Sequence, residues 1–401
     1  MIESMPMAIT AYTATSCAGR GLTATRSVLN AERTFLQPCQ FLDVALRTWV
    51  GEVDGLDDQP VANGFEPFDC RNNRLAYIGL LQDDFLAAVE RVRARYGHHR
   101  VGVFLGTSTS GLLNAELAYR HRDAVTGTLP DGFHYAQTQN MGSLAAFVRA
   151  YLALTGPMNV GSIACASSAK VFASGARALQ AGLVDAAIVG GVDTLCLTTL
   201  HGFSSLELLA PNACQPYGAE RNGISIGEAA AFILMERPSP QNAASPVLAG
   251  YGESSDAHHM SAPHPEGLGA QRAIRDALRR AACDPAQIDY VNLHGTATLS
   301  NDAAEDAAMY SVFGARVPVS STKGAVGHTL GAAGGLEAVL SLLALDHGMI
   351  PGGLNAKVVD PALKSDYRLH GERRQISRVM SNSFGFGGAN AALIFASGVG
   401  Q

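Results

Sequence analysis

Short apolar segments alternate with longer alanine-rich segments along the chain, and this alternation limits the fold more than any other feature. The apolar segments predict strands at residues 101–105, 186–189, 230–235, 288–293 and 391–395. The alanine-rich segments have helical periodicity and predict helices at residues 144–152, 167–183, 271–282 and 334–345. Strands that alternate with helices of about 10–15 residues are typical of α/β proteins. The sequence therefore predicts an α/β fold in which helices cover the sheets.

A segment rich in proline, serine and asparagine interrupts this pattern at residues 238–246, which read PSPQNAASP. It directly follows an apolar run that ends in LMER. Clusters of such residues mark loops between regular elements. The sequence on each side holds a strand–helix pattern that ends in a long apolar strand, which indicates a diverged duplication. We therefore predict an N-terminal half, residues 1–240, and a C-terminal half, residues 241–401.

Composition excludes several classes of protein. Hydrophobic residues make up 47% of the 401 residues and charged residues 16%, which is typical of a globular chain and not of a disordered one. The net charge is −6 and the sequence has no basic block, so a nucleic-acid partner is not expected. The seven cysteines form no CxxC motif, which favours reduced thiols in the cytoplasm. The first residues make a poor signal peptide, and no apolar run reaches the roughly 18 residues of a membrane span.

Cys165 stands where an apolar run, MNVGSIA, meets a predicted helix. Small residues follow it in the sequence CASSAK. The N-terminus of a helix favours a thiolate, and its free N–H groups can bind the oxyanion that forms when a carbonyl is attacked. A free cysteine is more often a buried structural residue. The neighbouring sequence must therefore decide between a nucleophile and a structural thiol.

Two histidines and a lysine follow predicted strands in the C-terminal half. His294 lies in the segment VNLHGTATLSND, and Lys323 and His328 lie in VSSTKGAVGHTLGAAGGLE. A histidine at the end of a strand can act as an acid, a base or a hydrogen-bond donor. Glycine, serine and threonine flank all three residues, which favours exposed backbone at a site over a purely structural role.

A metal site and a phosphate site are alternatives for these motifs. Cys165, His294 and His328 lie far apart in sequence and have no CxxC or HxxxH partner, so we expect no metal. The sequence SNSFGFGGAN at residues 381–390 is rich in glycine, but a strand and not a helix follows it, and GxxxxGK[ST] is absent. We expect either a simple hairpin turn or a loop that exposes backbone N–H groups and moves an aromatic ring.

Taken together, these motifs resemble the β-ketoacyl-acyl-carrier-protein synthases, the elongating condensing enzymes of fatty acid and polyketide synthesis. The chain carries ACASSAK, HGTATLSND, STKGAVGHTLGAAGGLE and NSFGFGGAN in the order of that family. GTSTSGL at residues 106–112, GGVD at 190–193 and PYGAERNGISIGEAAAFILMER at 216–237 also agree. The resemblance implies a thiolase-like fold with five layers and two duplicated βαβαβαββ halves.

The resemblance also implies roles for individual residues. Cys165 matches the acyl-accepting nucleophile, His294 and His328 the two catalytic histidines, and Lys323 the active-site lysine, which would orient His328 or set the local charge. Glu337 matches a supporting acid. The backbone N–H of Phe386 would form an oxyanion hole with that of Cys165. The remaining matches are the loop glycines Gly385 and Gly387 and the substrate-binding residues Thr296, Thr298, Thr109 and Phe384.

Some positions depart from the family pattern without removing any of these side chains. Leu299 stands where the family often has proline, and Thr109 stands where relatives have glycine or a larger apolar residue beside the acyl pocket. The stretch CQPYGAERNG replaces a more usual Arg-Pro-Phe-Asp stretch. These departures bear on the length and type of the acyl chain.

The implied reaction is a decarboxylative condensation of an acyl group on Cys165 with malonyl-acyl-carrier protein. No cofactor is expected beyond the phosphopantetheine that arrives on the carrier protein. Acyl and malonyl thioesters, the acyl carrier protein and a second subunit are the expected partners. That subunit makes either a homodimer or a heterodimer with a chain-length subunit.

Two alternatives stay open. A non-catalytic chain-length subunit has lost its nucleophile, whereas this chain retains Cys165. A degradative thiolase needs a second reactive cysteine late in the chain, whereas the last cysteine here is Cys283.

Overall fold

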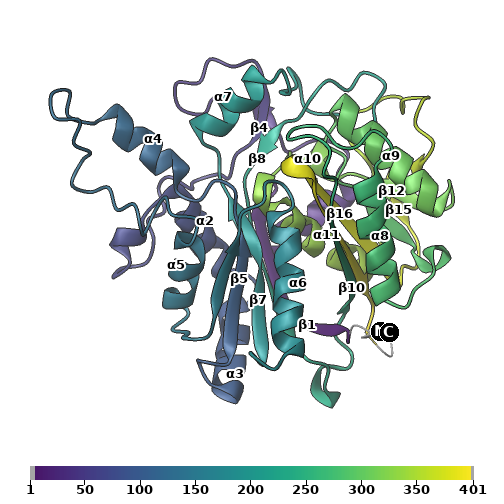
Figure 1. Cartoon of the computed structure of the whole chain (residues 1–401), viewed down its shortest axis with the longest axis horizontal. Helices are drawn as coiled ribbons and strands as arrows, with labels where there is room; N and C mark the ends of the chain where they lie inside the picture. The colour runs from purple at the N-terminus through teal and green to yellow at the C-terminus, as the bar shows by residue number, and fades with distance from the viewer. Residues whose placement is uncertain (1–4, 399–401) are drawn as a thin grey trace.

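The structure is a computed structural model that describes residues 5–398. Figure 1 shows two sheets with helices between them and on both outer faces. The strands are β1 (Met7–Ser16), β2 (Gly19–Arg20), β3 (Gln37–Pro38), β4 (Trp49–Gly51), β5 (Val101–Gly106), β6 (Met158–Gly161), β7 (Ala186–Asp193), β8 (Ile226–Gly227), β9 (Ala229–Glu236), β10 (Val247–Ser255), β11 (Tyr290–Asn292), β12 (Pro318–Ser320), β13 (Met349–Ile350), β14 (Asp366–Tyr367), β15 (Glu372–Arg373), β16 (Arg378–Gly385) and β17 (Ala389–Ala396).

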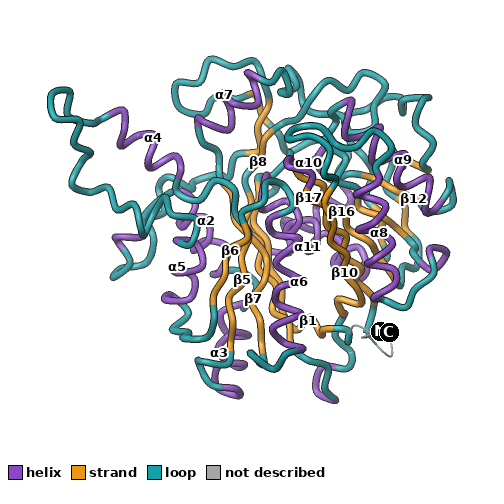
Figure 2. The backbone as a smooth tube through the Cα atoms, viewed as in Figure 1, coloured by secondary structure: helices purple, strands orange, loops and turns teal. Residues whose placement is uncertain are grey.

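Helices and loops connect these strands (Figure 2). The α-helices are α1 (Gly21–Arg26), α2 (Arg71–Leu80), α3 (Phe85–Tyr96), α4 (Leu112–Arg120), α5 (Ser143–Tyr151), α6 (Ser167–Gln180), α7 (Leu197–Ser205), α8 (Leu268–Arg280), α9 (Leu299–Phe313), α10 (Lys323–Val326) and α11 (Ala333–His347). The short 3₁₀ helices are η1 (Ser27–Asn30), η2 (Glu66–Phe68), η3 (Pro240–Asn242), η4 (Pro285–Gln287), η5 (Leu330–Ala332) and η6 (Phe386–Gly388).

The two halves of the chain use the same pattern of strand pairing. In the first half the order is β6-β5-β7-β9-β1, where β5 is parallel to β6 and β7, and β9 is antiparallel to β7 and β1. In the second half the order is β12-β11-β16-β17-β10, with parallel and antiparallel pairs in the same places. The pairing of β1 with β10 joins the two patterns. A duplicated α/β architecture is therefore confirmed, whereas the exact boundary at residue 240 stays a prediction.

The helices complete five layers. Helices α2, α3 and α5 pack on the outer face of the first sheet, and α8 packs on the outer face of the second sheet with α9 against it. Helices α6 and α11 lie between the sheets and contact each other (Figures 1 and 2). A Cβ atom on Gly106, at the end of β5, would lie 2.3 Å from the backbone nitrogen of Ser168. The absence of a side chain there lets the first turn of α6 approach the strand closely.

The helical segment made of η5 and α11 is the one segment in residues 5–398 that is long and apolar enough to cross a membrane. The segment Leu330–His347 has 18 residues and a mean hydropathy of 1.2, and 89% of it is buried inside the protein. Glu337 and Asp346 interrupt its apolar character, so no continuous apolar run is visible in the sequence. Its burial identifies it as a core helix.

Every strand and helix expected from periodicity is present, but some bounds differ. The strand expected at 288–293 is limited to Tyr290–Asn292, and the one expected at 186–189 extends to Asp193. The glycine-rich segment near the end connects β16 and β17, which pair antiparallel, so the expected hairpin is confirmed.

Candidate active site

Cys165 lies in a tight turn between β6 and α6. The strand ends at Gly161, so the apolar run does not continue as a strand into the cysteine as expected. Ala164, directly before the cysteine, has a φ of 52°, a left-handed conformation that is costly for a residue with a side chain. The Ser167 hydroxyl accepts a hydrogen bond from the N–H of Ile163 and donates one to the carbonyl oxygen of Ala164. This turn holds the Cys165 side chain at the N-terminus of α6.

The two histidines are positioned by their backbone contacts. His294 follows β11, and the N–H groups of His294 and Gly295 donate to the buried Glu305 carboxylate at 2.8 and 2.7 Å. His328 lies between α10 and η5, and its N–H donates to the carbonyl oxygen of Ser225 at 2.7 Å. Both imidazoles are buried.

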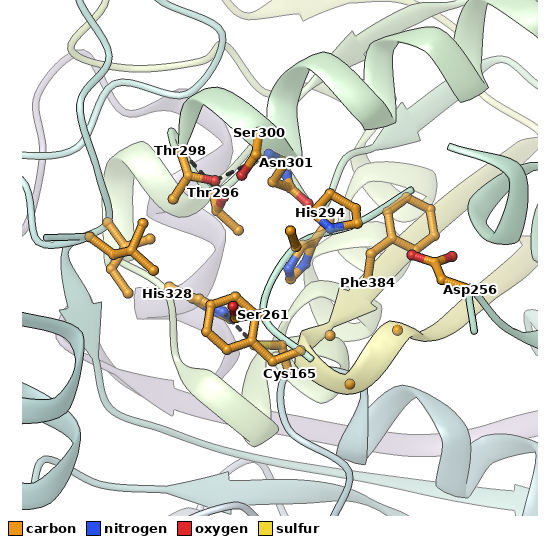
Figure 3. A pocket seen from close by; sticks show the side chains of 18 of the residues that line it. Cys165, Asp256, Ser261, His294, Thr296, Thr298, Ser300, Asn301, His328 and Phe384 are labelled. Atoms are coloured by element: carbon orange, nitrogen blue, oxygen red, sulfur yellow. Dashed lines mark hydrogen bonds between the residues drawn. The ribbon is translucent and has the colours of Figure 1, made fainter. Parts of the chain in front are cut away.

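The fold brings Cys165, His294 and His328 together, although they are far apart in sequence (Figure 3). The Nε2 atom of His328 lies 3.0 Å from the Sγ atom of Cys165. The two imidazole rings meet edge to face, with centroids 5.2 Å apart. This arrangement places two imidazoles beside one sulfur.

Lys323 lies behind His294 and not beside His328. Its ammonium group is 3.4 Å from the Nδ1 atom of His294 and forms a buried ion pair with Glu337. An ammonium group can only donate, so Nδ1 of His294 accepts and its proton resides on Nε2. This contact makes His294 a hydrogen-bond donor, and the Lys323 charge also acts on His328, whereas orientation of His328 by Lys323 stays a prediction.

Burial and the Lys323 charge control the protonation of the site. Burial lowers the pKa values of His294 and His328 well below the usual value, and the charge of Lys323 lowers them further. Burial raises the pKa of the Cys165 thiol to about 11, against the opposing effects of Lys323 and the Phe386 N–H. Both imidazoles are thus neutral near pH 7, and each carries one N–H donor.

The glycine-rich hairpin turn lies directly against the cysteine. A Cβ atom on Gly385 would lie 3.2 Å from the backbone nitrogen of Cys165, and Gly387 has a φ of 78°. The N–H of Phe386 is directed at the Cys165 sulfur. Phe384 packs against the His294 ring, with centroids 6.1 Å apart. A side chain at Gly385 would therefore press on the backbone beside Cys165.

A cavity opens onto these side chains. Of the residues expected from the sequence, its lining includes Cys165, His294, His328, Thr296, Thr298, Phe384, Gly385, Phe386 and Gly387. The lining also includes residues that were not expected as site residues, namely the apolar Phe203, Leu208 and Ile224 and the polar Asp256, Ser261, Ser300, Asn301 and Asn390, of which Ile224, Ser300, Asn301 and Asn390 lie within the quoted motifs. Ser300 and Asn301 could have been found from their position beside Thr298. The apolar residues carry no comparable signal in the sequence.

Thr109 does not belong to the cavity lining. Its side chain is buried, and its hydroxyl donates to the Asp193 carboxylate at 2.7 Å. Contact with an acyl chain therefore stays a prediction for this residue. Lys323 and Glu337 also lie outside the lining, because they are buried behind His294.

The geometry fits a thiol–imidazole pair better than a metal site. The nearest ligand atoms of Cys165, His294 and His328 lie within 4.8 Å of one another, so their separation in sequence is no argument against a metal. However, two ligands on tetrahedral zinc stand about 3.5 Å apart, whereas Cys165 and His328 are in contact at 3.0 Å. The Lys323 ammonium group beside His294 would also repel a cation.

The raised pKa of Cys165 predicts how the thiol responds to pH. Because the thiolate is the reactive form, we expect its alkylation by iodoacetamide to become roughly tenfold faster per pH unit from about pH 7 to about pH 10. Mass spectrometry of the peptide that contains Cys165 measures this rate. A short cysteine peptide blocked at both ends, with an ordinary thiol pKa near 8.5, should reach a plateau above about pH 9. A plateau near pH 8 for Cys165 would contradict the prediction.

Two family models match most of the chain. Residues 85–241 match the model "Beta-ketoacyl synthase, N-terminal domain", and residues 246–357 match "Beta-ketoacyl synthase, C-terminal domain". These matches contain Cys165, His294 and His328.

Named relatives agree with these matches. A mitochondrial 3-oxoacyl-[acyl-carrier-protein] synthase of Arabidopsis thaliana is 39% identical over 261 residues, which are 60% of this chain and 57% of that protein. The 3-oxoacyl-[acyl-carrier-protein] synthase 2 of Rhizobium meliloti is 34% identical over 310 residues, 73% of each chain. A chain from the solved complex of a ketosynthase with its chain length factor, from Xenorhabdus doucetiae, superposes with a TM-score of 0.88 at 38% identity and 98% coverage of both chains.

Proposed function

The chain belongs to the β-ketoacyl synthase family, and we propose that it joins an acyl group held on Cys165 to malonyl-acyl-carrier protein with loss of carbon dioxide. The observation that carries this proposal is the group formed by Cys165, His328 and His294 inside one cavity. A nucleophile with two neighbouring hydrogen-bond donors suits covalent acyl transfer followed by condensation.

In the first half-reaction the Cys165 sulfur attacks the thioester carbonyl of an acyl-carrier protein. His328, 3.0 Å away, donates its Nε2–H to the sulfur and so favours the attacking thiolate, whose proton goes to solvent, while the departing carrier thiolate takes a proton from solvent. The N–H groups of Cys165 and Phe386 bind the oxyanion of the tetrahedral intermediate. An acyl thioester on Cys165 remains when the carrier leaves.

In the second half-reaction a malonyl-carrier protein enters the cavity and loses carbon dioxide. The bond to the carboxylate breaks, and its electron pair forms an enolate whose oxygen accepts hydrogen bonds from His294 and His328. Lys323 keeps the His294 proton on Nε2, so this donor is already in place. The enolate carbon then attacks the acyl-Cys165 carbonyl, the carbon–sulfur bond breaks, and a β-ketoacyl-carrier protein is released.

The rest of the cavity fits a thioester on a long flexible arm. Thr296 and Thr298 supply hydroxyl groups along one wall, and their two oxygens lie 3.0 Å apart. Phe203, Leu208 and Ile224 supply an apolar wall for the acyl chain. We assign Phe386 as the ring that gates this wall, because it packs against Phe203 with centroids 5.8 Å apart. No metal or redox cofactor enters this scheme, and phosphopantetheine arrives on the carrier protein.

We propose that the protein acts in the cytoplasm as a dimer of two similar chains. Strand β6 lies at the end of the sheet order, which leaves one of its edges for another strand. Met158 in β6 and Ile163 after it are 39% and 37% exposed. Figure 1 also shows α4 and the loop after it extending away from the body of the molecule. A homodimer is our first choice, and light scattering of the purified chain tests it. A monomer would favour a heterodimer with a chain-length subunit.

Mass spectrometry of the carrier protein tests the proposed reaction. We expect an acyl-carrier protein, malonyl-carrier protein and the purified chain to give carbon dioxide and a carrier whose acyl group has gained two carbons and a β-keto group. The Cys165 peptide should carry the acyl group when malonyl-carrier protein is omitted. A non-catalytic chain-length subunit would leave Cys165 unmodified and form no product, which would overturn the proposal. A panel of acyl chains of different length and unsaturation would then define the pathway.

A further inference from the structure

The buried carboxylate of Asp193, at the end of β7, takes no part in the proposed chemistry, yet it is among the most extensively hydrogen-bonded side chains near the site. It is fully buried. Its partners are neutral donors from two separate segments. They are the hydroxyl of Thr107 (2.6 Å), the N–H (2.9 Å) and hydroxyl (2.6 Å) of Ser108, the N–H (2.9 Å) and hydroxyl (2.7 Å) of Thr109, and the N–H of Gly331 (2.6 Å).

These donors belong to different halves of the molecule. Residues 107–109 follow β5 of the first half, whereas Gly331 lies in the second half, three residues after His328 and just before α11. A Cβ atom on Gly331 would lie 2.7 Å from Oδ2 of Asp193 and 2.8 Å from the backbone nitrogen of Ser108. The carboxylate therefore fastens the His328 segment to the turn after β5 at a contact that leaves no room for a side chain.

The backbone beside these contacts is strained on both sides. Leu330, between His328 and Gly331, has a φ of 52°, and Ser110, next to Thr109, has a φ of 47°. Residues with side chains persist in this left-handed region only where surrounding contacts hold them. The hydrogen bonds of Asp193 to Gly331 and Thr109 are contacts of this kind.

We propose that Asp193 is a positioning residue that holds the His328 segment in place and so keeps the imidazole in contact with the Cys165 sulfur. Strand β8 contacts His328 from one side, and Asp193 binds the N–H of Gly331, in the turn that follows His328, from the other side. The inference rests on the proposed function for its kinetic readout only.

The negative charge of Asp193 and its positioning hydrogen bonds act on the reactivity of Cys165 in opposite directions. This difference makes the inference testable. Asp193 is one of the groups that raise the pKa of the Cys165 thiol. Removing its charge therefore increases the thiolate fraction, and an effect of charge alone would make Cys165 more reactive and acyl transfer faster. Loss of positioning would instead make both the thiol and the enzyme slower, because His328 would leave the Cys165 sulfur.

Asp193→Asn keeps the shape of the side chain but turns one acceptor into a donor that faces N–H and O–H groups. We expect kcat for condensation to fall by about tenfold or more, with KM for malonyl-carrier protein changed by less than about threefold. Alkylation of Cys165 by iodoacetamide at about pH 9 should become slower, because His328 no longer contacts the sulfur. A folded Asp193→Asn protein that keeps the parent kcat would overturn the inference, and so would a parallel increase in alkylation and kcat.

Asp306→Asn is a matched control. Asp306 is also a buried carboxylate that holds a loop, through the N–H groups of Lys364 and Ser365, but its partners lie away from the cavity lining. We expect it to leave both readouts unchanged, and an equal loss of kcat in this variant would assign the effect to general loosening. If Asp193→Asn does not fold, Thr107→Val removes one donor and should lower kcat about threefold. An unchanged Thr107→Val would then overturn the inference. Failure of the proposed function would instead be evident in the parent, which would form no product.

Discussion

Cys165→Ala is expected to abolish acyl transfer and with it the formation of β-ketoacyl product, by at least about 10⁴-fold. The sulfur is the atom that carries the acyl group between the two carrier proteins, and no other thiol lies in the cavity lining. The substitution removes little volume from a buried position, so the fold should survive. The measurements are the turnover of acyl- and malonyl-carrier protein and the mass of the labelled peptide.

A matched cysteine variant separates the role of this sulfur from a general effect of losing a thiol. Cys283 is only partly buried and lies beyond the C-terminal end of α8, so Cys283→Ala should keep the parent rate. Product formation by Cys165→Ala at a rate near that of the parent would mean that the acyl group is not held on this residue. Equal loss of activity in Cys283→Ala would point to a stability effect instead.

His294→Ala and His328→Ala are each expected to lower condensation by about 10²–10³-fold, because each removes a donor to the enolate oxygen. The two variants should differ in the first half-reaction. His328 contacts the Cys165 sulfur at 3.0 Å, so its loss should also slow acylation of Cys165. His294 receives its hydrogen bond from Lys323 behind it, so its loss should act mainly on decarboxylation.

Separate assays of acylation and of carbon dioxide release measure this difference. His294→Asn retains an N–H donor and should keep more decarboxylation than His294→Ala. His99→Ala serves as the control, because His99 is exposed in the loop before β5. Equal losses in both half-reactions for both histidine variants would contradict the division of roles, and unchanged condensation would contradict the proposed mechanism.

Local sequence patterns predicted the elements of the fold but not the contacts between distant segments. The apolar run at 186–189 was enough to place β7, because an uninterrupted buried strand leaves a simple pattern. The same pattern could not show that β7 ends in a carboxylate that binds Gly331, more than a hundred residues later. Sequence order puts Lys323 close to His328, and it cannot show that the fold also brings the Lys323 ammonium group to Nδ1 of His294.

The sequence predicted the polar residues of the candidate site, which lie in glycine-rich loops. It did not predict the apolar residues that line the cavity. Cys165, His294 and His328 could be selected because small neighbours are unusual around buried strands. Phe203 and Ile224 resemble ordinary core residues in the sequence, and only their position around the cavity distinguishes them. Thr109 resembles a pocket residue by its place in a motif, but its hydroxyl donates a hydrogen bond to the Asp193 carboxylate.

The repeated strand pairing has a consequence for how such a centre could arise. Cys165 follows β6 and His328 follows β12, and these strands occupy equivalent places in the two halves. An ancestor assembled from two identical short chains would have presented the same side chain twice across its symmetry axis, either two thiols or two imidazoles. Only after gene fusion released each copy to mutate independently could sulfur occur on one side and imidazole on the other. The chemical asymmetry of the centre therefore records the loss of an older symmetry.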